Sequence, residues 1–344
     1  MTADSRRLAV RLDRLAANVR RYRQAAHGLI ARVDHDGFGL GLVPVARECA
    51  DAGADLLAVA DFDEAVRVRA AGVSIPLLAF RPDGASVAGL GVVAAAGTRA
   101  EAERALDRGA DGIHTVIDCG GARRGFAPDD ASGMASVASI APVAALMGVA
   151  DPRVAHDHAA DALQRARDTI GTGVPAHLHG TRGVLAGRGA DDEFVRVGRG
   201  LYGIPYPDGT ATGSVVARLT GRVVLTKRIA AGEGVSYGYI YRAEKDGRIA
   251  LVTCGYADGV PRIVGNDAEV AIGGHRARVI GRVAMDVVVV DLGGVTAQPG
   301  DEVVFLGDPA EGEPGLAEWA RITGRDTVEL AATIGPRVIR SYQR

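Results

Sequence analysis

The side chains best suited to chemistry follow short apolar runs in the first 200 residues. Carboxylates and imidazoles of this kind transfer protons or bind metal ions. Two carboxylates flank one histidine in Asp34-His35-Asp36, which follows the apolar run 29–33 and precedes the glycine-rich loop 37–41. The remaining members of this set, each placed at the end of an apolar run, are Asp61, Asp118, Cys119, His177, His179 and Arg196.

Amine chemistry has few candidates in this chain. Of its 40 basic residues only Lys227 and Lys245 are lysines. Lys227 follows an apolar run, and Lys245 lies in an expected turn, 244–247. We expect both to lie outside the part of the chain that carries the acidic and imidazole side chains.

The elements that position these residues are indicated by alternation along the chain. From residue 8 to about 200, short apolar runs alternate with helical patterns about eight times, which predicts an α/β fold, a (β/α)₈ TIM barrel over residues 1–212. An open doubly wound sheet is the competing arrangement. The expected barrel strands are 29–33, 56–60, 75–79, 91–95, 112–117, 143–149, 174–178 and 194–197.

A second pattern begins after a cluster of prolines and glycines near residue 210. Alternating segments separated by turn residues predict a C-terminal antiparallel β domain over residues 213–344. Its expected strands are 222–225, 249–253, 269–272, 277–280, 287–291 and 302–306, followed by a helix at 315–323 and a strand near Val338.

Composition narrows the class of protein. A formal net charge of −2 with 47% hydrophobic residues fits a globular chain and gives no electrostatic sign of nucleic-acid binding. The longest apolar run, 140–150, is too short for a membrane span. Residues 1–7 are polar and predict no secretory signal, and three spaced cysteines predict no disulfide framework. We therefore expect a soluble, cytoplasmic protein without membrane or nucleic-acid partners.

Four ordered motifs resemble the alanine racemase family, whose members have this barrel and β domain and bind pyridoxal phosphate (PLP). The resemblance runs nearly end to end, from an opening strand and helix at 10–19. The motifs are Val235-Ser236-Tyr237-Gly238, Gly255-Tyr256-Ala257-Asp258-Gly259, Gly281-Arg282-Val283-Ala284-Met285-Asp286, and Arg196-Val197-Gly198 with Leu201-Tyr202-Gly203.

The resemblance implies roles for residues that match the family. Arg196 would face the pyridine nitrogen of PLP, Tyr237 would act as a catalytic base, and Arg123 would orient the substrate carboxylate. Met285 would contact the substrate through its backbone, with Tyr256 beside it. The resemblance also implies a homodimer in which the β domain of one subunit completes the active site of the other.

Other positions depart from the family. The lysine that attaches PLP is Asp34, and the phosphate-binding tyrosine is Phe38. A carboxylate cannot form an imine, and its charge would oppose the phenolate and phosphate of PLP. Departures of the same kind are Leu146 for a histidine, Val116 for a lysine that is often carbamylated, Thr181 for a phosphate-binding serine, and Arg199 for an apolar residue.

These departures lead us to expect a PLP-independent enzyme with no cofactor. It would act on a small carboxylate-bearing, amino-acid-derived substrate by hydrolysis, cyclisation, condensation or epimerisation. Asp34 and Tyr237 would transfer protons, and the expected substrate-binding residues are Arg123, Arg196, Tyr256, Met285, His179 and Arg199.

Three alternatives stay open. The chain could be a catalytically silent amino-acid-binding or regulatory homologue, or a racemase that binds PLP without covalent attachment. A metal site is a less favoured alternative, with Asp34, Asp36, Asp118, His177 and His179 as its ligands.

Overall fold

The computed structural model describes residues 6–120, 124–148, 156–170 and 173–344. The chain divides into two compact units, one of Leu15–Leu201 and one of Met1–Arg14 with Tyr202–Arg344. The first is the barrel and the second is the antiparallel domain.

Eight parallel strands form the barrel, in the order β8-β7-β6-β5-β4-β3-β2-β9. The backbone N–H of Arg196 on β9 donates to the carbonyl of His179 after β8 at 2.8 Å, which joins the two ends of the sheet. The strands are β2 (Leu29–Arg32), β3 (Leu56–Val59), β4 (Leu77–Ala79), β5 (Val92–Ala96), β6 (Gly112–Val116), β7 (Val143–Met147), β8 (Ala176–His177) and β9 (Val195–Val197). The expected TIM barrel is confirmed.

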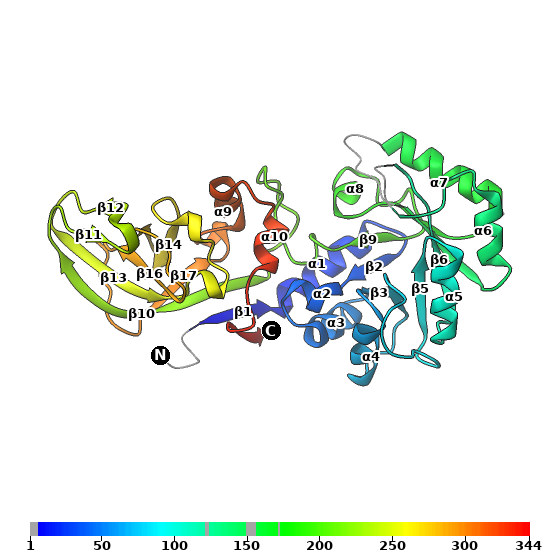
Figure 1. The fold of residues 1–344 in the computed structure, drawn as a ribbon, viewed down its shortest axis with the longest axis horizontal. Coiled ribbons are helices and arrows are strands. Elements are labelled where there is room, and N and C mark those ends of the chain that lie inside the picture. Colours follow the sequence, from blue (N-terminus) through cyan, green and yellow to red (C-terminus); the bar gives the residue numbers. More distant parts are fainter. Residues whose placement is uncertain (1–5, 121–123, 149–155, 171–172) are drawn as a thin grey trace. The chain divides into compact units, whose positions relative to one another are not determined.

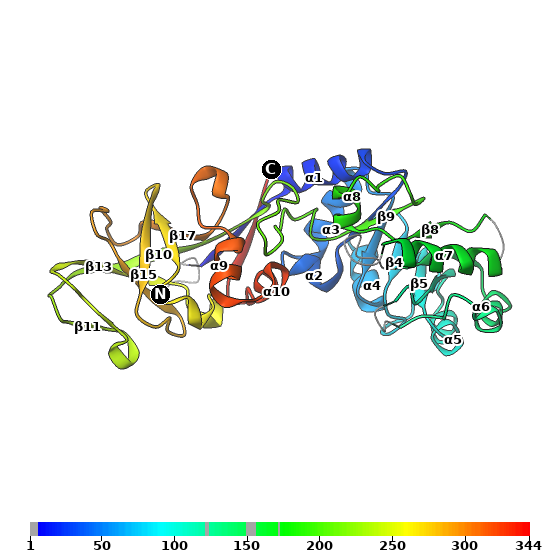
Figure 2. The same cartoon turned by 90° about the horizontal axis from the view of Figure 1, so that it is seen from above.

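Helices surround these strands (Figures 1 and 2). Side-chain caps begin three of them, because the oxygens of Asp61, Thr98 and Asp130 accept backbone N–H groups that have no helical partner. The helices are α1 (Leu12–Gln24), α2 (Asp34–Phe38), α3 (Leu42–Asp51), α4 (Phe62–Ala70), α5 (Arg99–Asp107), α6 (Ala131–Ala138), α7 (His156–Ile170) and α8 (Thr181–Leu185).

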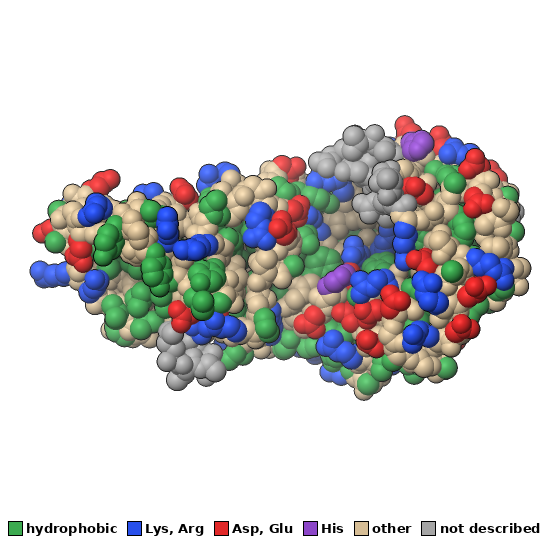
Figure 3. Space-filling view, in the orientation of Figure 1, with side chains coloured by type: hydrophobic (Ala, Val, Ile, Leu, Met, Phe, Trp, Pro, Cys, Tyr) green, Lys and Arg blue, Asp and Glu red, His purple; other side chains and the backbone are tan. Residues whose placement is uncertain are grey.

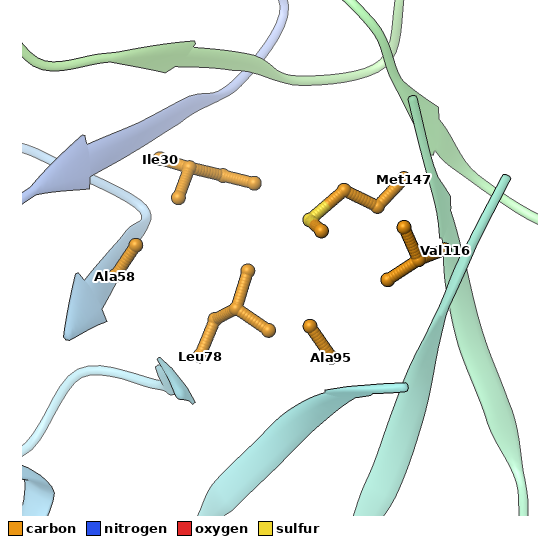
Figure 4. Close-up of a cluster of buried hydrophobic side chains, with 6 residues drawn as sticks. All are labelled: Ile30, Ala58, Leu78, Ala95, Val116 and Met147. Atoms are coloured by element: carbon orange, nitrogen blue, oxygen red, sulfur yellow. The ribbon is translucent and has the colours of Figure 1, made fainter. Parts of the chain in front are cut away.

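Alternate side chains of six barrel strands meet in the barrel interior (Figure 4). Because neighbouring residues of a strand point to opposite faces, each strand places every second residue there. The cluster consists of Ile30, Ala58, Leu78, Ala95, Val116 and Met147, all less than 8% exposed, and Phe80 packs against it. The interior is a packed core, so a binding site belongs at its carboxyl end.

The antiparallel domain is built on an eight-stranded sheet in the order β13-β16-β15-β14-β17-β10-β1-β18. Its strands are β1 (Arg7–Arg11), β10 (Ala217–Ile229), β13 (Gly247–Thr253), β14 (Glu269–Ile272), β15 (His275–Ile280), β16 (Val287–Asp291), β17 (Glu302–Leu306) and β18 (Ile339–Gln343). A small hairpin, β11 (Gly234–Val235) with β12 (Tyr241–Arg242), and helices α9 (Leu316–Thr323) and α10 (Thr327–Ala332) complete it.

The first strand differs from the expectation that residues 1–212 form the barrel. β1 pairs antiparallel with β10 and parallel with β18, so the chain begins in the antiparallel sheet before it enters the barrel. The buried Arg6 side chain, with its Nε 3.0 Å from the Asp258 carboxylate, anchors this strand within the same unit.

No helix among the described residues is long and apolar enough to cross a membrane. Figure 3 shows hydrophobic side chains exposed over the antiparallel domain, whereas acidic and basic side chains intermingle over the barrel.

Candidate functional site

The carboxyl end of β2 carries an ion pair. Ile30 points into the barrel core, and strand alternation places Arg32 on the same face. The Nε of Arg32 donates to Oδ1 of Asp34 at 3.0 Å, and its Nη2 donates to Oδ2 at 2.7 Å. The Nδ1 of His35 lies 2.8 Å from the same Oδ2. Both carboxylate oxygens of Asp34 are therefore engaged.

Two aromatic rings hold the guanidinium of Arg32. Its Cζ lies 5.2 Å from the ring centre of Phe80 and 5.7 Å from that of Phe38. Directly after β9, a Cβ at Gly198 would lie 2.8 Å from Phe38 and 3.4 Å from the Arg32 Cδ. Glycine at position 198 thus lets the ring and the arginine stem approach β9.

The ion pair determines the charge state of Asp34, whose side chain is 1% exposed. Burial alone would raise the pKa of this carboxyl, but the hydrogen bonds and positive charge of Arg32 outweigh burial, so its pKa is lowered. An ionised carboxylate with both oxygens bonded is a weak base and holds no proton to donate. The geometry favours a positioning role for Asp34 over the expected proton transfer.

A strained turn follows this carboxylate. His35, Asp36, Gly37, Phe38 and Gly39 all have φ between 56° and 80°. Left-handed backbone costs about 1–2 kcal/mol at each non-glycine residue. The Asp36 side chain accepts the backbone N–H of Leu42 at 3.0 Å, which ties the turn to helix α3. The turn reverses the chain tightly enough to bring the Phe38 ring over Arg32.

A second polar network crosses the barrel interior. The Nε2 of His177 on β8 lies 2.9 Å from Nδ1 of His114 on β6, and its Nδ1 contacts Nη1 of Arg196 on β9. Arg196 also donates to the carbonyl of Gly148 at 2.9 Å. Because arginine only donates, Nδ1 of His177 accepts, and its proton lies on Nε2.

Burial and the charge of Arg196 keep both histidines neutral. They lower the pKa of His114 to about 4 and hold that of His177 well below 6.5. The network therefore has one positive charge, on Arg196, at the carboxyl end of the barrel.

The expected substrate residues His179 and Arg199 have different surroundings. The His179 side chain is 1% exposed, and its Nδ1 lies 2.9 Å from Asp192, whose carboxylate also accepts two backbone N–H groups. This is a structural contact, away from solvent. Arg199 is partly buried after β9, where the Gly200 N–H donates to the Thr181 hydroxyl at 3.1 Å.

The suggested metal ligands do not converge. Among the described residues no group of three or more His, Cys, Asp or Glu side chains could hold a metal ion. Asp118 accepts the backbone N–H of Gly120, and His177 is engaged by His114 and Arg196.

The antiparallel domain carries the other expected site residues. Tyr237, Tyr256 and Met285 are 65%, 40% and 56% exposed. Arg123 lies outside the described residues. Both lysines are exposed in this domain, with Lys227 on β10, 3.6 Å from Glu233.

The sequence pattern did not identify Arg32 or His114 as residues of the site. Arg32 sits two positions before Asp34, so strand alternation alone could have indicated the pair. His114 lies inside an apolar strand, and its partner His177 is 63 residues away, so nothing local connects them.

Comparisons with known proteins place these features in a family context. Residues 10–206 match the family model "Alanine racemase, N-terminal domain", and residues 216–342 match "Alanine racemase, C-terminal domain". A Beutenbergia cavernae protein named alanine racemase is 35% identical, over 98% of this chain and 97% of that protein.

Solved structures agree in fold. Alanine racemase from Streptomyces lavendulae superposes with a TM-score of 0.89 at 32% identity, covering 100% of this chain and 98% of that one. Alanine racemase from Bartonella henselae, described with covalently bound pyridoxal phosphate, gives 0.87 at 20% identity, covering 98% and 99%.

The family match and the full-length similarity to a protein named alanine racemase contradict the expected PLP-independent enzyme without a cofactor. That expectation rested on Asp34, which cannot form an imine and whose negative charge was expected to oppose PLP. The structure pairs that carboxylate with Arg32, so the lysine position carries a neutral pair that brings a guanidinium to the barrel end. The Arg32–Asp34 pair carries no net charge and Arg196 adds a positive charge, so the barrel end fits a phosphorylated, anionic cofactor.

Proposed function

The chain belongs to the alanine racemase family, and on that premise we propose that it is a PLP-dependent amino-acid racemase that holds the cofactor without a covalent bond. Full-length similarity to proteins named alanine racemase is the observation that carries this proposal. Alanine is the first substrate to test.

The non-covalent part rests on the positions of the lysines. Asp34 stands where the family has its attaching lysine, and the barrel contains no lysine. Lys227 and Lys245 are both in the antiparallel domain.

The residues that would hold PLP lie on the last two barrel strands and the segments after them. Arg196, oriented by His177 and the Gly148 carbonyl, would face the pyridine nitrogen. Thr181 and the backbone at Gly198 would lie near the phosphate, as the loops after the last strands of such barrels do. When bound, PLP supplies an electron sink for the carbanion formed at the amino-acid Cα.

The protein's own residues would bind the substrate and move its proton. By the resemblance, Tyr237 would exchange the Cα proton on one face, while Arg123 and the Met285 backbone would hold the carboxylate, with Tyr256 beside them. We also propose a cytoplasmic homodimer with shared sites.

Reconstitution with PLP tests this proposal. We expect the purified protein to bind PLP with a change in visible absorbance that dialysis reverses, and borohydride treatment to leave its mass unchanged. Racemisation of L-alanine, followed by chiral chromatography, should require added PLP.

The variant Asp34→Lys is the matched comparison, because it restores an amine at the family position. After borohydride reduction it should gain the mass of one pyridoxyl phosphate group, because imine formation with the new lysine releases one water. Binding of PLP and alanine without racemisation would support the silent homologue, and absence of PLP binding would contradict the proposal. A stable adduct on Lys227 or Lys245 would refute non-covalent attachment.

A further inference from the structure

We propose that Arg32 is an anion-binding residue at the carboxyl end of the barrel and that Asp34 positions it. This inference deepens the proposed function by adding a cation at the lysine position. Arg32 would bind an anionic oxygen of a small ligand, supplied by the phosphate of PLP or the carboxylate of the amino acid.

The direction of the side chain supports this role. Arg32 follows Ile30 of the barrel core on the same strand face, and its guanidinium lies against Phe80, which packs on that core. Its side chain remains 36% exposed, although Asp34 beside it is 1% exposed. The guanidinium therefore lies between the closed core and solvent, where a ligand of such a barrel binds.

Asp34, Phe38 and Phe80 fix the guanidinium of Arg32 in one orientation, and we call these three residues the clamp. Asp34 engages Nε and Nη2 in a bidentate pair, and the rings of Phe38 and Phe80 lie 5.7 and 5.2 Å from Cζ. A guanidinium held in this way loses little further freedom when it binds an anion, and charge-assisted hydrogen bonds are among the strongest in proteins.

Glycine directly after β9 lets the Arg32 side chain lie close to the end of that strand. A Cβ at Gly198 would lie 2.8 Å from the Phe38 ring and 3.4 Å from the Arg32 Cδ, so these two residues occupy the place of a side chain. Arg32 therefore lies beside the segment after the last barrel strand, where phosphate groups bind in many such barrels. This proximity favours the phosphate, and the experiment separates it from the carboxylate.

Equilibrium binding tests the proposal without any measurement of turnover. The probes are PLP, pyridoxal, inorganic phosphate and L-alanine, the last with PLP-loaded and PLP-free protein. Removing Arg32 alone would leave the buried Asp34 carboxylate without its bidentate partner, which destabilises the fold. The main variant is therefore Arg32→Gln/Asp34→Asn, a neutral pair of similar shape, with Arg32→Lys as a second variant.

The matched control is Arg99→Gln/Glu103→Gln, on the outer helix α5, where Arg99 pairs with Glu103. Like the main variant, it replaces an ion pair by two amides and leaves the net charge unchanged, away from the site. We expect the main variant to bind the anion at least about tenfold more weakly, the lysine variant to fall between, and the control to match the wild type. Thermal melts confirm that each variant is folded.

Binding of a phosphate and binding of a carboxylate by Arg32 predict different changes in affinity for the four probes. If Arg32 binds phosphate, the main variant loses affinity for PLP and inorganic phosphate but not for pyridoxal. If it binds the carboxylate, only alanine binding weakens. Unchanged affinity of the folded main variant for all four probes would overturn the proposal.

The positioning role of Asp34 has its own readout. Asp34→Asn alone makes the site more positive, so a pure charge effect would tighten anion binding, whereas loss of the clamp weakens it. We expect weaker binding, and tighter binding would refute the positioning role. Arg32-dependent binding of phosphate or alanine in a protein that does not take up PLP would support this inference and contradict the proposed function.

Discussion

Two buried histidines show how single residues set the charge of the barrel interior. His114 and His177 are 5% and 0% exposed and hydrogen-bonded to each other beside Arg196. A second positive charge there would be costly, so both rings stay neutral and Arg196 holds the charge. Since protonated imidazole is favoured only in the unfolded chain, these residues couple stability to pH.

The stability of the barrel should therefore fall in mild acid. The pKa of His114 drops from 6.5 to about 4 on folding. The unfolded state thus binds more protons between these values, and stability present above pH 6.5 is lost as the pH falls toward 4. We expect His114 alone to contribute a loss of about 2 kcal/mol between pH 7 and pH 5, measured by urea denaturation.

The variant His114→Gln should flatten this pH dependence, because an amide oxygen can still accept from His177 but does not titrate. His275→Gln, at an exposed position on β15, is the control and should behave as the wild type. An equal slope for His114→Gln and wild type would contradict the assignment.

At the scale of elements, strand β2 and the turn after it together position Arg32. Strand β2 places the Arg32 side chain at the carboxyl end of the barrel core. Five residues with left-handed backbone then reverse the chain, so that the Phe38 ring lies over the guanidinium. Such strain persists only where surrounding contacts enforce it. Here the contacts are the Asp34 pair and the bond from Asp36 to helix α3.

Two glycines of the turn make a matched test. Gly37 and Gly39 have φ of 63° and 80°. A Cβ at Gly37 would lie 3.1 Å from Val45, whereas one at Gly39 meets nothing within 4 Å. Alanine at either position should cost about 1–2 kcal/mol for backbone strain, with a further loss at Gly37. Equal unfolding free energies for the two variants would show that the Val45 contact is unimportant.

At the scale of the molecule, the two compact units differ in surface character. The ten exposed large hydrophobic side chains of the described residues all lie between Val224 and Tyr342, in the antiparallel domain. Where such side chains gather into one patch, they mark an association site. This supports the proposed homodimer, in which that domain contributes Tyr237 to a partner.

Mixing two inactive variants tests a shared site. Arg196→Ala removes a barrel residue, and Tyr237→Phe removes a residue of the antiparallel domain. If each site combines both domains from different subunits, equal mixtures should recover about a quarter of wild-type racemisation through heterodimers with one intact site. Sedimentation should show dimers, and no recovery in mixed dimers would argue against sharing.

Most of the fold could be predicted from local pattern. Strands 269–272, 287–291 and 302–306 coincide with β14, β16 and β17, because short runs rich in Val and other apolar residues, bounded by turn glycines, specify strands. The membership of β1 in the antiparallel sheet could not be predicted in this way, since its partners β10 and β18 lie more than 200 residues away.

The sequence by itself determined the family, the barrel and the absence of a lysine from it, because these depend on residue identity and periodicity. Only the tertiary structure decided how the negative charge of Asp34 is compensated. Its charge depends on the guanidinium that reaches it, on its burial and on the aromatic rings that hold Arg32, and these are properties of three-dimensional proximity. For the same reason, the neutral His114–His177 pair emerged only when two distant strands were brought together.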